Sequence, residues 1–250
     1  MKQLNLRFGK NPPVKDYRTF MWVNYIKDDI PNPPNSISQT ERVYRNLEET
    51  DPAILFPMDG NDQYGNCTIA AAAHANTIHR GMIFQKEIMP EELVIKIYMH
   101  LTGGNDTGLA MLPVLEYLRR NIVAGDKLLA YVSINPHNHT HVKQAMMLFG
   151  GIYTGFQVQV NCLEDFKEGK MWEPGELINS GHAVFVTDYN ETGVNCLTWG
   201  RTQWGSWEWW DTCVDEAYVL LVPEARDTNF APGFNFERLQ KDLVSVADWV

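Results

Sequence analysis

The first half of the chain has apolar residues at helical spacing. This spacing predicts three helices, from Cys67 to about Phe84, over 90–101 and over 112–121. Asn66 stands at the N-cap position of the first helix, and Pro90 suits the first position of the second. Together these segments predict a helical lobe over residues 59–125.

The second half changes to the alternating pattern of β-strands. Strand-like segments lie at 128–134, 152–160, 183–189, 193–199, 206–210 and 216–222. Thr140 is the expected cap of a helix over 141–150, which the glycines at 150 and 151 end. Residues 161–180 have the acidic composition of a surface loop. We therefore expect an α+β protein whose helical lobe is followed by a β-rich lobe over 126–222.

The two ends of the chain differ from these lobes. Residues 1–58 are punctuated by prolines, which predicts an extended arm with one short helix near Ser38 to Leu47. Such an arm is ordered only if it lies on another part of the protein. The tail over 223–250 carries one amphipathic segment, which predicts a single helix.

Composition and charge exclude several classes of function. The 250 residues are 44% hydrophobic and 21% charged, with a net charge of −10, which argues against nucleic acid as a partner. No apolar run is long enough to span a bilayer, and the N-terminus lacks the apolar core of a secretory signal. The four cysteines fit neither a zinc pattern nor a disulfide framework. We therefore expect free thiols and a cytoplasmic location, with no membrane partner.

One cysteine lies in a sequence that favours reactivity. Residues 60–66 form a Gly/Asn/Asp-rich turn, and Cys67 opens the alanine-rich helix that follows. The unpaired amides and dipole of a helix N-terminus favour a thiolate. His182, in the string GHAVFVTDY, is the expected base, so the pair predicts nucleophilic cysteine chemistry. The alternative is a buried structural thiol beside a hydrogen-bonded strand histidine.

An ordered series of strings resembles the papain-like cysteine peptidases, in a divergent form similar to bacterial and phage proteins. The strings are GNC at 65–67, the helix at 112–121, the helix and strand at 141–158, GHAVFVTDY at 181–189 and TWGRTQWGS at 198–206. The resemblance covers roughly residues 15–222. It implies a two-lobed papain-like fold, with a helical lobe followed by an antiparallel, β-barrel-like lobe.

The same resemblance assigns roles to residues of this sequence. It implies that Cys67 is the nucleophile, His182 the base and Asn61 the side-chain donor to an oxyanion. Trp199 corresponds to the tryptophan that shields the histidine. Substrate would be bound by residues flanking these groups, namely Gly65, Asn66, Gly181 and Trp199 itself.

One position departs from the family's pattern. The asparagine that orients the histidine is replaced by Leu197, which cannot accept a hydrogen bond from the imidazole. Thr198 is adjacent but would point to the opposite face of a strand, whereas Asn195 shares the face of Leu197. Asn195 is therefore the predicted substitute, and the departure puts catalytic competence in question more than the fold.

These features predict a thiol hydrolase, most simply a cysteine peptidase that acts on a protein or peptide without a metal or cofactor. The alternative is a papain-fold structural or interaction protein with little activity, assembled into a larger complex such as a phage virion. A transglutaminase-like or amidase-like acyl transfer uses the same groups and is equally consistent with the sequence.

Overall fold

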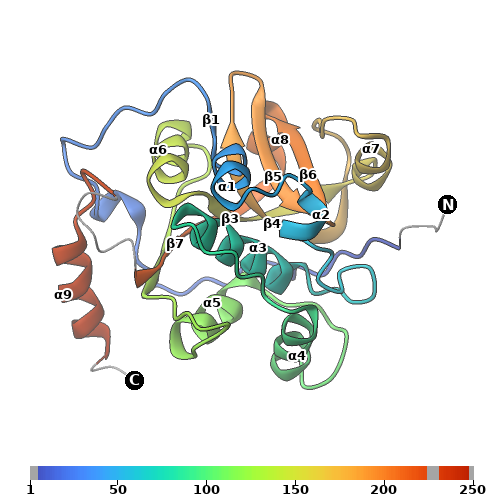
Figure 1. Cartoon of the computed structure of the whole chain (residues 1–250), viewed down its shortest axis with the longest axis horizontal. Coiled ribbons are helices and arrows are strands. Elements are labelled where there is room, and N and C mark those ends of the chain that lie inside the picture. The colour runs from blue at the N-terminus through green and yellow to red at the C-terminus, as the bar shows by residue number, and fades with distance from the viewer. Residues whose placement is uncertain (1–4, 224–230, 248–250) are drawn as a thin grey trace.

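The computed structural model describes residues 5–223 and 231–247, which form a helical lobe against a twisted sheet (Figure 1). The helical lobe contains α3 (Cys67–Met82), α4 (Glu91–Leu101) and α5 (Met111–Arg120). All three predicted helices are therefore confirmed, with two corrections at their starts. Pro90 is the N-cap of α4 rather than its first residue, and the Asn66 side chain does not cap α3.

The second lobe is an antiparallel sheet. Its strands are β1 (Ile37–Ser38), β2 (Ala130–Ser133), β3 (Ile152–Gln159), β4 (Leu177–Tyr189), β5 (Gly193–Thr198), β6 (Arg201–Ser206) and β7 (Val214–Leu221). The order is β2-β7-β3-β4-β5-β6, with β1 paired to β4. The fold class is α+β as expected, but the sheet is open, so the barrel-like description of this lobe is wrong.

Two segments of the second lobe differ from the sequence prediction. Residues 206–210 were expected as a strand, but Ser206 accepts a hydrogen bond from the Trp209 backbone and caps helix α8 (Trp207–Cys213). The chain is therefore helical after Ser206, and the strand lies before it, at residues 201–206. The loop expected over 161–180 contains α7 (Cys162–Glu168) and the first residues of β4.

The sheet separates two apolar cores. On one face, Tyr153, Phe185 and Leu197 pack with α3 and its neighbouring helices. On the other face, the core includes residues of α6 (His139–Phe149) and α8. Helix α6 is capped by Asn138 rather than Thr140, and it ends at Gly150 as predicted. The sheet therefore has helices on both faces, and α3 lies centrally against one of them (Figure 1).

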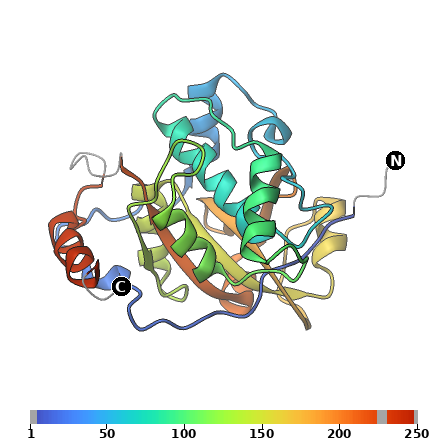
Figure 2. The same cartoon turned by 90° about the horizontal axis from the view of Figure 1, so that it is seen from below.

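The N-terminal residues pass along both lobes. Residues 5–36 contain only η1 (Trp22–Asn24), and α1 (Gln39–Leu47) and α2 (Pro52–Leu55) follow. The helix predicted near residues 38–47 is thus confirmed, as is the tail helix, α9 (Phe236–Ala247). In Figure 2 the dark-blue start of the chain runs between the green helices and the yellow and orange strands. Within the described ranges, no helix is long and apolar enough to cross a membrane.

Candidate active site

Cys67 begins α3 and lies where the two lobes meet. Its side chain is buried, and the backbones of Ala183 and Gly9 hydrogen-bond to the sulfur. Burial raises the pKa of the thiol to about 11, although these hydrogen bonds oppose the shift. The thiolate expected from the helix N-terminus is therefore absent in this covered conformation, because desolvation outweighs the favourable dipoles.

His182 precedes Ala183 on β4, so the sequence-predicted nucleophile and base come from segments that meet. The ring Nε2 of His182 lies 2.8 Å from the hydroxyl of Thr198, whereas its buried Nδ1 has no hydrogen-bond partner. Burial, and secondarily the charge of His74, lowers the pKa of His182 to about 3. The imidazole is therefore neutral and is not hydrogen-bonded to the sulfur in this conformation.

The strand register explains why Thr198, and not Asn195, contacts the histidine. Phe185 pairs with Leu197, so these two side chains share one face of the sheet. His182 is three residues before Phe185 and Thr198 is one after Leu197, so both lie on the opposite face. The amide of Asn195 donates to Asp188 at 3.0 Å. The assignment of Asn195 as the orienting residue is therefore corrected: the contact belongs to Thr198.

Trp199 covers the imidazole, as the resemblance implies for this position. Its ring stacks on His182 with centroids 4.2 Å apart and an interplanar angle of 20°. Trp199 has φ +47° and Gly200 has φ +77°, which form the two-residue turn between β5 and β6. A bulky residue rarely adopts this left-handed conformation, so the turn holds the indole over His182 at some cost in strain.

The loop before Cys67 contains the expected oxyanion donor. The side-chain amide of Asn61 donates to the Tyr64 carbonyl at 3.0 Å, and the Asn61 carbonyl accepts from the backbone of Arg7 at 3.0 Å. In this conformation the amide is therefore committed to its own loop. Gly65 is fixed by a hydrogen bond from its amide to Asp106 at 2.9 Å.

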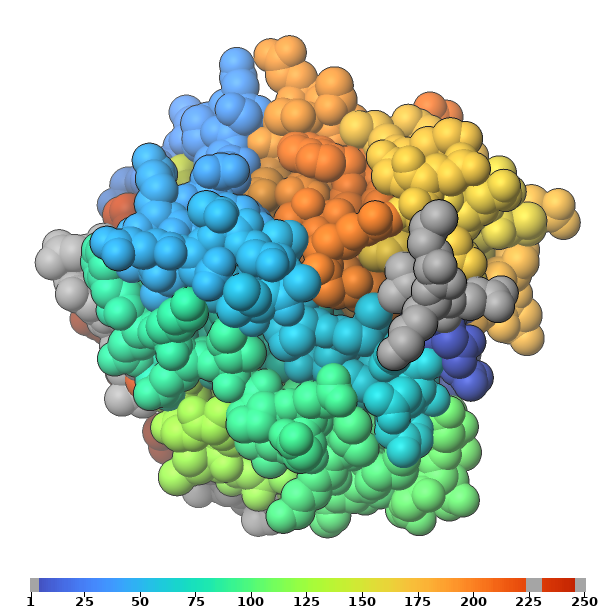
Figure 3. Space-filling view, turned by 45° about the vertical axis from the view of Figure 1, so that its right-hand side comes forward, coloured from blue at the N-terminus to red at the C-terminus, as the bar shows by residue number. Residues whose placement is uncertain are grey.

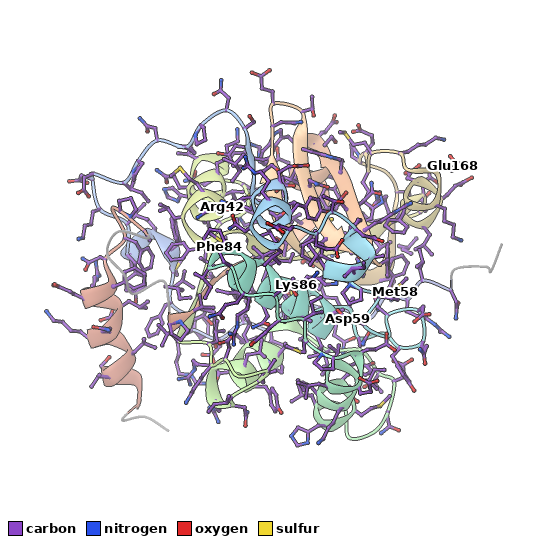
Figure 4. The ribbon with its side chains drawn as sticks, in the orientation of Figure 1. Arg42, Met58, Asp59, Phe84, Lys86 and Glu168 are labelled. Carbon is purple, nitrogen blue, oxygen red and sulfur yellow. The ribbon has the colours of Figure 1, made fainter. Side chains whose placement is uncertain are left out.

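The buried residue Asp59 supports the same loop. Asp59 (labelled in Figure 4) accepts from the Asn66 amide at its carbonyl, and its carboxylate lies 3.3 Å from Nε2 of His74. The same nitrogen lies 2.9 Å from the carbonyl of Pro57. His74 is thus a hydrogen-bonded core residue. Asn66, which was expected to bind substrate, instead fastens the turn that carries Cys67.

Residues 7–11, here called the cleft segment, cover the site. The Gly181 carbonyl accepts hydrogen bonds from Gly9 at 3.2 Å and from Lys10 at 3.0 Å. Across the cleft, the Leu109 amide donates to Gly9 at 2.8 Å. Phe8 packs edge-on to His182, with centroids 5.7 Å apart. Through these backbone hydrogen bonds the cleft segment crosses between the lobes, and it seals the sulfur and imidazole from solvent.

The cleft continues beyond this segment as a groove of ≈ 840 Å³. Gly65, Gly108 and Gly181 line it, so two of the four residues expected to bind substrate border this groove. In Figure 3 the dark-blue start of the chain lies between the surfaces of the two lobes. The prolines of residues 1–58 predict an extended arm, but no feature of the sequence indicates that Phe8 and Gly9 lie on the site.

The remaining cysteines and histidines do not form a second centre. Cys162, Cys196 and Cys213 are free and buried, like Cys67. His139 lies 2.7 Å from Asp211. Among the residues that the structure describes, no group of three or more His, Cys, Asp or Glu side chains is placed to hold a metal ion.

Comparison with known proteins shows the fold but no close relative. No family model matches the sequence, and no curated protein matches it. The structure is similar to xylellain, a cysteine protease from Xylella fastidiosa, with a TM-score of 0.65, 17% identity and coverage of 88% of this chain and 98% of that one. It is also similar to digestive procathepsin L 3 of Tenebrio molitor, with a TM-score of 0.52, 11% identity and coverage of 87% and 76%. The first of these is described as a cysteine protease and the second as a procathepsin, and the chain has the papain-like fold.

Proposed function

We propose that this protein is a thiol hydrolase of the cysteine-peptidase type, held in a covered state by its own residues 7–11. One observation carries the proposal. The sulfur of Cys67, at the start of a helix, is hydrogen-bonded by Ala183, next to a histidine that Thr198 and Trp199 hold in place. Such a constellation suits nucleophilic acyl transfer.

The first step requires displacement of the cleft segment, because the sulfur and imidazole are sealed. In the proposed tautomer, Nε2–H of His182 donates a hydrogen bond to the Thr198 hydroxyl, which leaves Nδ1 unprotonated and able to take the thiol proton. Exposure to water would also remove the desolvation that opposes charge on both groups. The resulting thiolate attacks a peptide carbonyl and forms a tetrahedral intermediate.

The later steps use groups of the same loop. The backbone amide of Cys67, at the first position of α3, has no partner within the helix and would donate to the oxyanion. The amide of Asn61 would add a second donor after it turns away from Tyr64. Protonated His182 then gives its proton to the leaving amine, and water hydrolyses the thioester to release the acyl product.

The test uses a variant in which the cleft segment cannot lie in its place. A Cβ atom on Gly9 would stand 1.8 Å from the carbonyl oxygen of Gly65, so Gly9→Ala is expected to displace the segment. This variant should cleave an unfolded protein substrate, and adding Cys67→Ala should abolish cleavage. Cys213→Ala, at another buried free cysteine, is the matched control and should leave cleavage unchanged. Loss of cleavage with Cys213→Ala but not Cys67→Ala contradicts the proposal.

The sealed site also favours a second candidate, a papain-fold interaction protein that does not turn over substrate. In that case the cleft segment is a permanent part of the core, and the molecule acts through assembly, for example in a phage virion. The same experiment separates the two. A folded Gly9→Ala protein with no cleavage and no reaction at Cys67 supports the interaction protein and contradicts the hydrolase.

A further inference from the structure

Lys10 is a buried cation beside the cleft. Its side chain is only 1% exposed, and its Nζ lies 3.0 Å from each carboxylate oxygen of Asp215. It also lies 3.1 Å from the carboxylate of Glu216, which is itself held by the Tyr218 hydroxyl at 3.0 Å. A buried ammonium needs such partners, because an unpaired buried charge is strongly unfavourable.

The walls of this pocket leave room for the stem of the lysine. A Cβ atom on Gly155 would stand 2.1 Å from Cε of Lys10, and one on Gly181 would stand 2.5 Å from the Lys10 carbonyl oxygen. Gly155 also lies close to the sulfur of Met111, which forms an apolar side. The pocket therefore combines an apolar channel for methylene groups with a charged end.

The pocket contains more acidic groups than its occupant, Lys10, contains basic groups. Two carboxylates, Asp215 and Glu216, face the single ammonium of Lys10. Departure of the cleft segment would leave both acids without their cation, and Glu216 is nearly as buried as a core residue. An empty pocket would therefore attract another cationic side chain more strongly than an apolar one.

The pocket lies in line with the candidate nucleophile. Gly155 on β3 pairs with Ala183 on β4 and with Glu216 on β7, so these residues stand side by side across the sheet. Ala183 hydrogen-bonds to the sulfur of Cys67, and so does Gly9, which precedes Lys10. If a peptide placed a side chain in this pocket, the backbone within about one residue of that side chain would therefore lie at the sulfur of Cys67.

We propose that the pocket formed by Gly155, Asp215 and Glu216 is a specificity site for lysine or arginine side chains, and that Lys10 occupies it as a stand-in for substrate. This inference rests on the proposed function and names its substrate class: peptides with a basic residue next to the bond that is cut. The extended backbone pairing of residues 9–11 with Leu109 and Gly181 is the mode in which such a peptide would bind.

Binding is tested apart from catalysis in the full chain carrying Cys67→Ala and Lys10→Ala. Fluorescent pentapeptides copy residues 7–11, with lysine, norleucine or glutamate at the fourth position, and their affinities are measured by anisotropy. Norleucine matches the lysine stem without the ammonium. The remaining cleft segment competes equally with all three peptides, so the ratio of affinities is unaffected. The lysine peptide is expected to bind at least about tenfold more tightly than the norleucine peptide.

The carboxylates provide the control. Adding Asp215→Asn and Glu216→Gln should reduce the lysine preference to within about twofold, with folding checked by thermal melting. If that protein does not fold, Asp215→Asn alone carries the comparison, because its side chain is 21% exposed, and the ratio should fall about threefold. Equal binding of lysine and norleucine peptides, or a preference that survives loss of the carboxylates, overturns the proposal.

A hydrolysis experiment then shows whether the pocket binds substrate side chains or binds only Lys10 of the cleft segment. The Lys10→Ala protein, with Cys67 present, is given internally quenched peptides that carry lysine, arginine, norleucine or glutamate at each position in turn. Cleavage confined to bonds near lysine or arginine supports the proposal, and cleavage without such a preference overturns it. If nothing is cleaved while the binding preference stands, the proposed hydrolase fails and the cation pocket remains.

Discussion

The hydroxyl of Thr198 lies 2.8 Å from Nε2 of His182, where the family's pattern would place the amide of an asparagine at position 197. A hydroxyl can accept a hydrogen bond from the imidazole N–H and so fix the tautomer of the ring. Its side chain reaches the ring because both residues lie on one face of paired strands β4 and β5. The leucine at position 197 therefore does not leave the histidine without a partner.

Removal of this hydroxyl is expected to slow turnover without unfolding the protein. In the Gly9→Ala background, Thr198→Val should lower kcat by about tenfold or more, because the tautomer is no longer fixed. Thr198→Ser retains the acceptor and should keep most of the activity. Steady-state kinetics on one peptide substrate measures both variants. Equal kcat for the valine and serine variants would show that Thr198 does not position His182.

Asn195 is expected to matter for stability rather than for turnover. Its amide donates to the buried carboxylate of Asp188, whose pKa is raised by burial and held down in part by this bond. Asn195→Ala should therefore lower the free energy of unfolding by about 1.5–3 kcal/mol, the usual range for hydrogen bonds to charged groups. Urea denaturation measures the loss, and kcat in the Gly9→Ala background should be unchanged. A large fall in kcat with normal stability would return Asn195 to the active site.

Acid is expected to favour uncovering of the site. Covered His182 has a pKa lowered to about 3, and exposure should return it toward its ordinary value near 6.5. Between these values the open form binds more protons than the covered form, so each unit of falling pH favours opening by up to about tenfold. The reaction rate of Cys67 with 2,2′-dipyridyl disulfide, relative to glutathione, should rise from pH 7 to pH 4.

The matched control for this pH dependence is His182→Gln, which removes the titrating ring. In this variant, the reaction rate of Cys67 relative to that of glutathione should change little across the same pH range. A wild-type rate that is flat, or that falls relative to glutathione as the pH falls, would show that protonation of His182 is not linked to opening.

The sequence predicts the helices well because their periodicity is local. The alanine-rich run after Cys67 forms α3, a helix that can be buried on all sides. Gly150 ends a different helix, α6, and does so with a positive φ. The tryptophan-rich segment after Ser206 was assigned to a strand because aromatic residues favour strands, but a serine cap and burial of Trp209, Trp210 and Cys213 make it helical.

The site was only partly predictable, since its contacts depend on register and on distant segments. Alternation correctly placed Thr198 and Leu197 on opposite faces, but the face of His182 follows from the pairing of Phe185 with Leu197, which sequence alone does not give. The ion pairs of Lys10 with Asp215 and Glu216 join residues from opposite ends of the chain. No local pattern marks such pairs.

The central claim is that a reactive cysteine lies beneath a removable segment. The most direct measurement is the pH dependence of iodoacetamide labelling at Cys67, mapped by mass spectrometry, in the native protein and in Gly9→Ala. The control is Gly175→Ala, where an added Cβ meets only ordinary contacts. In the native protein and the control, Cys67 should be inert near pH 7, as expected for a buried thiol whose pKa is raised to about 11. In Gly9→Ala it should react rapidly near pH 7, well ahead of Cys162 and Cys213. If Cys67 in a folded Gly9→Ala protein labels no faster than those two cysteines, it is not a nucleophile and the account is contradicted.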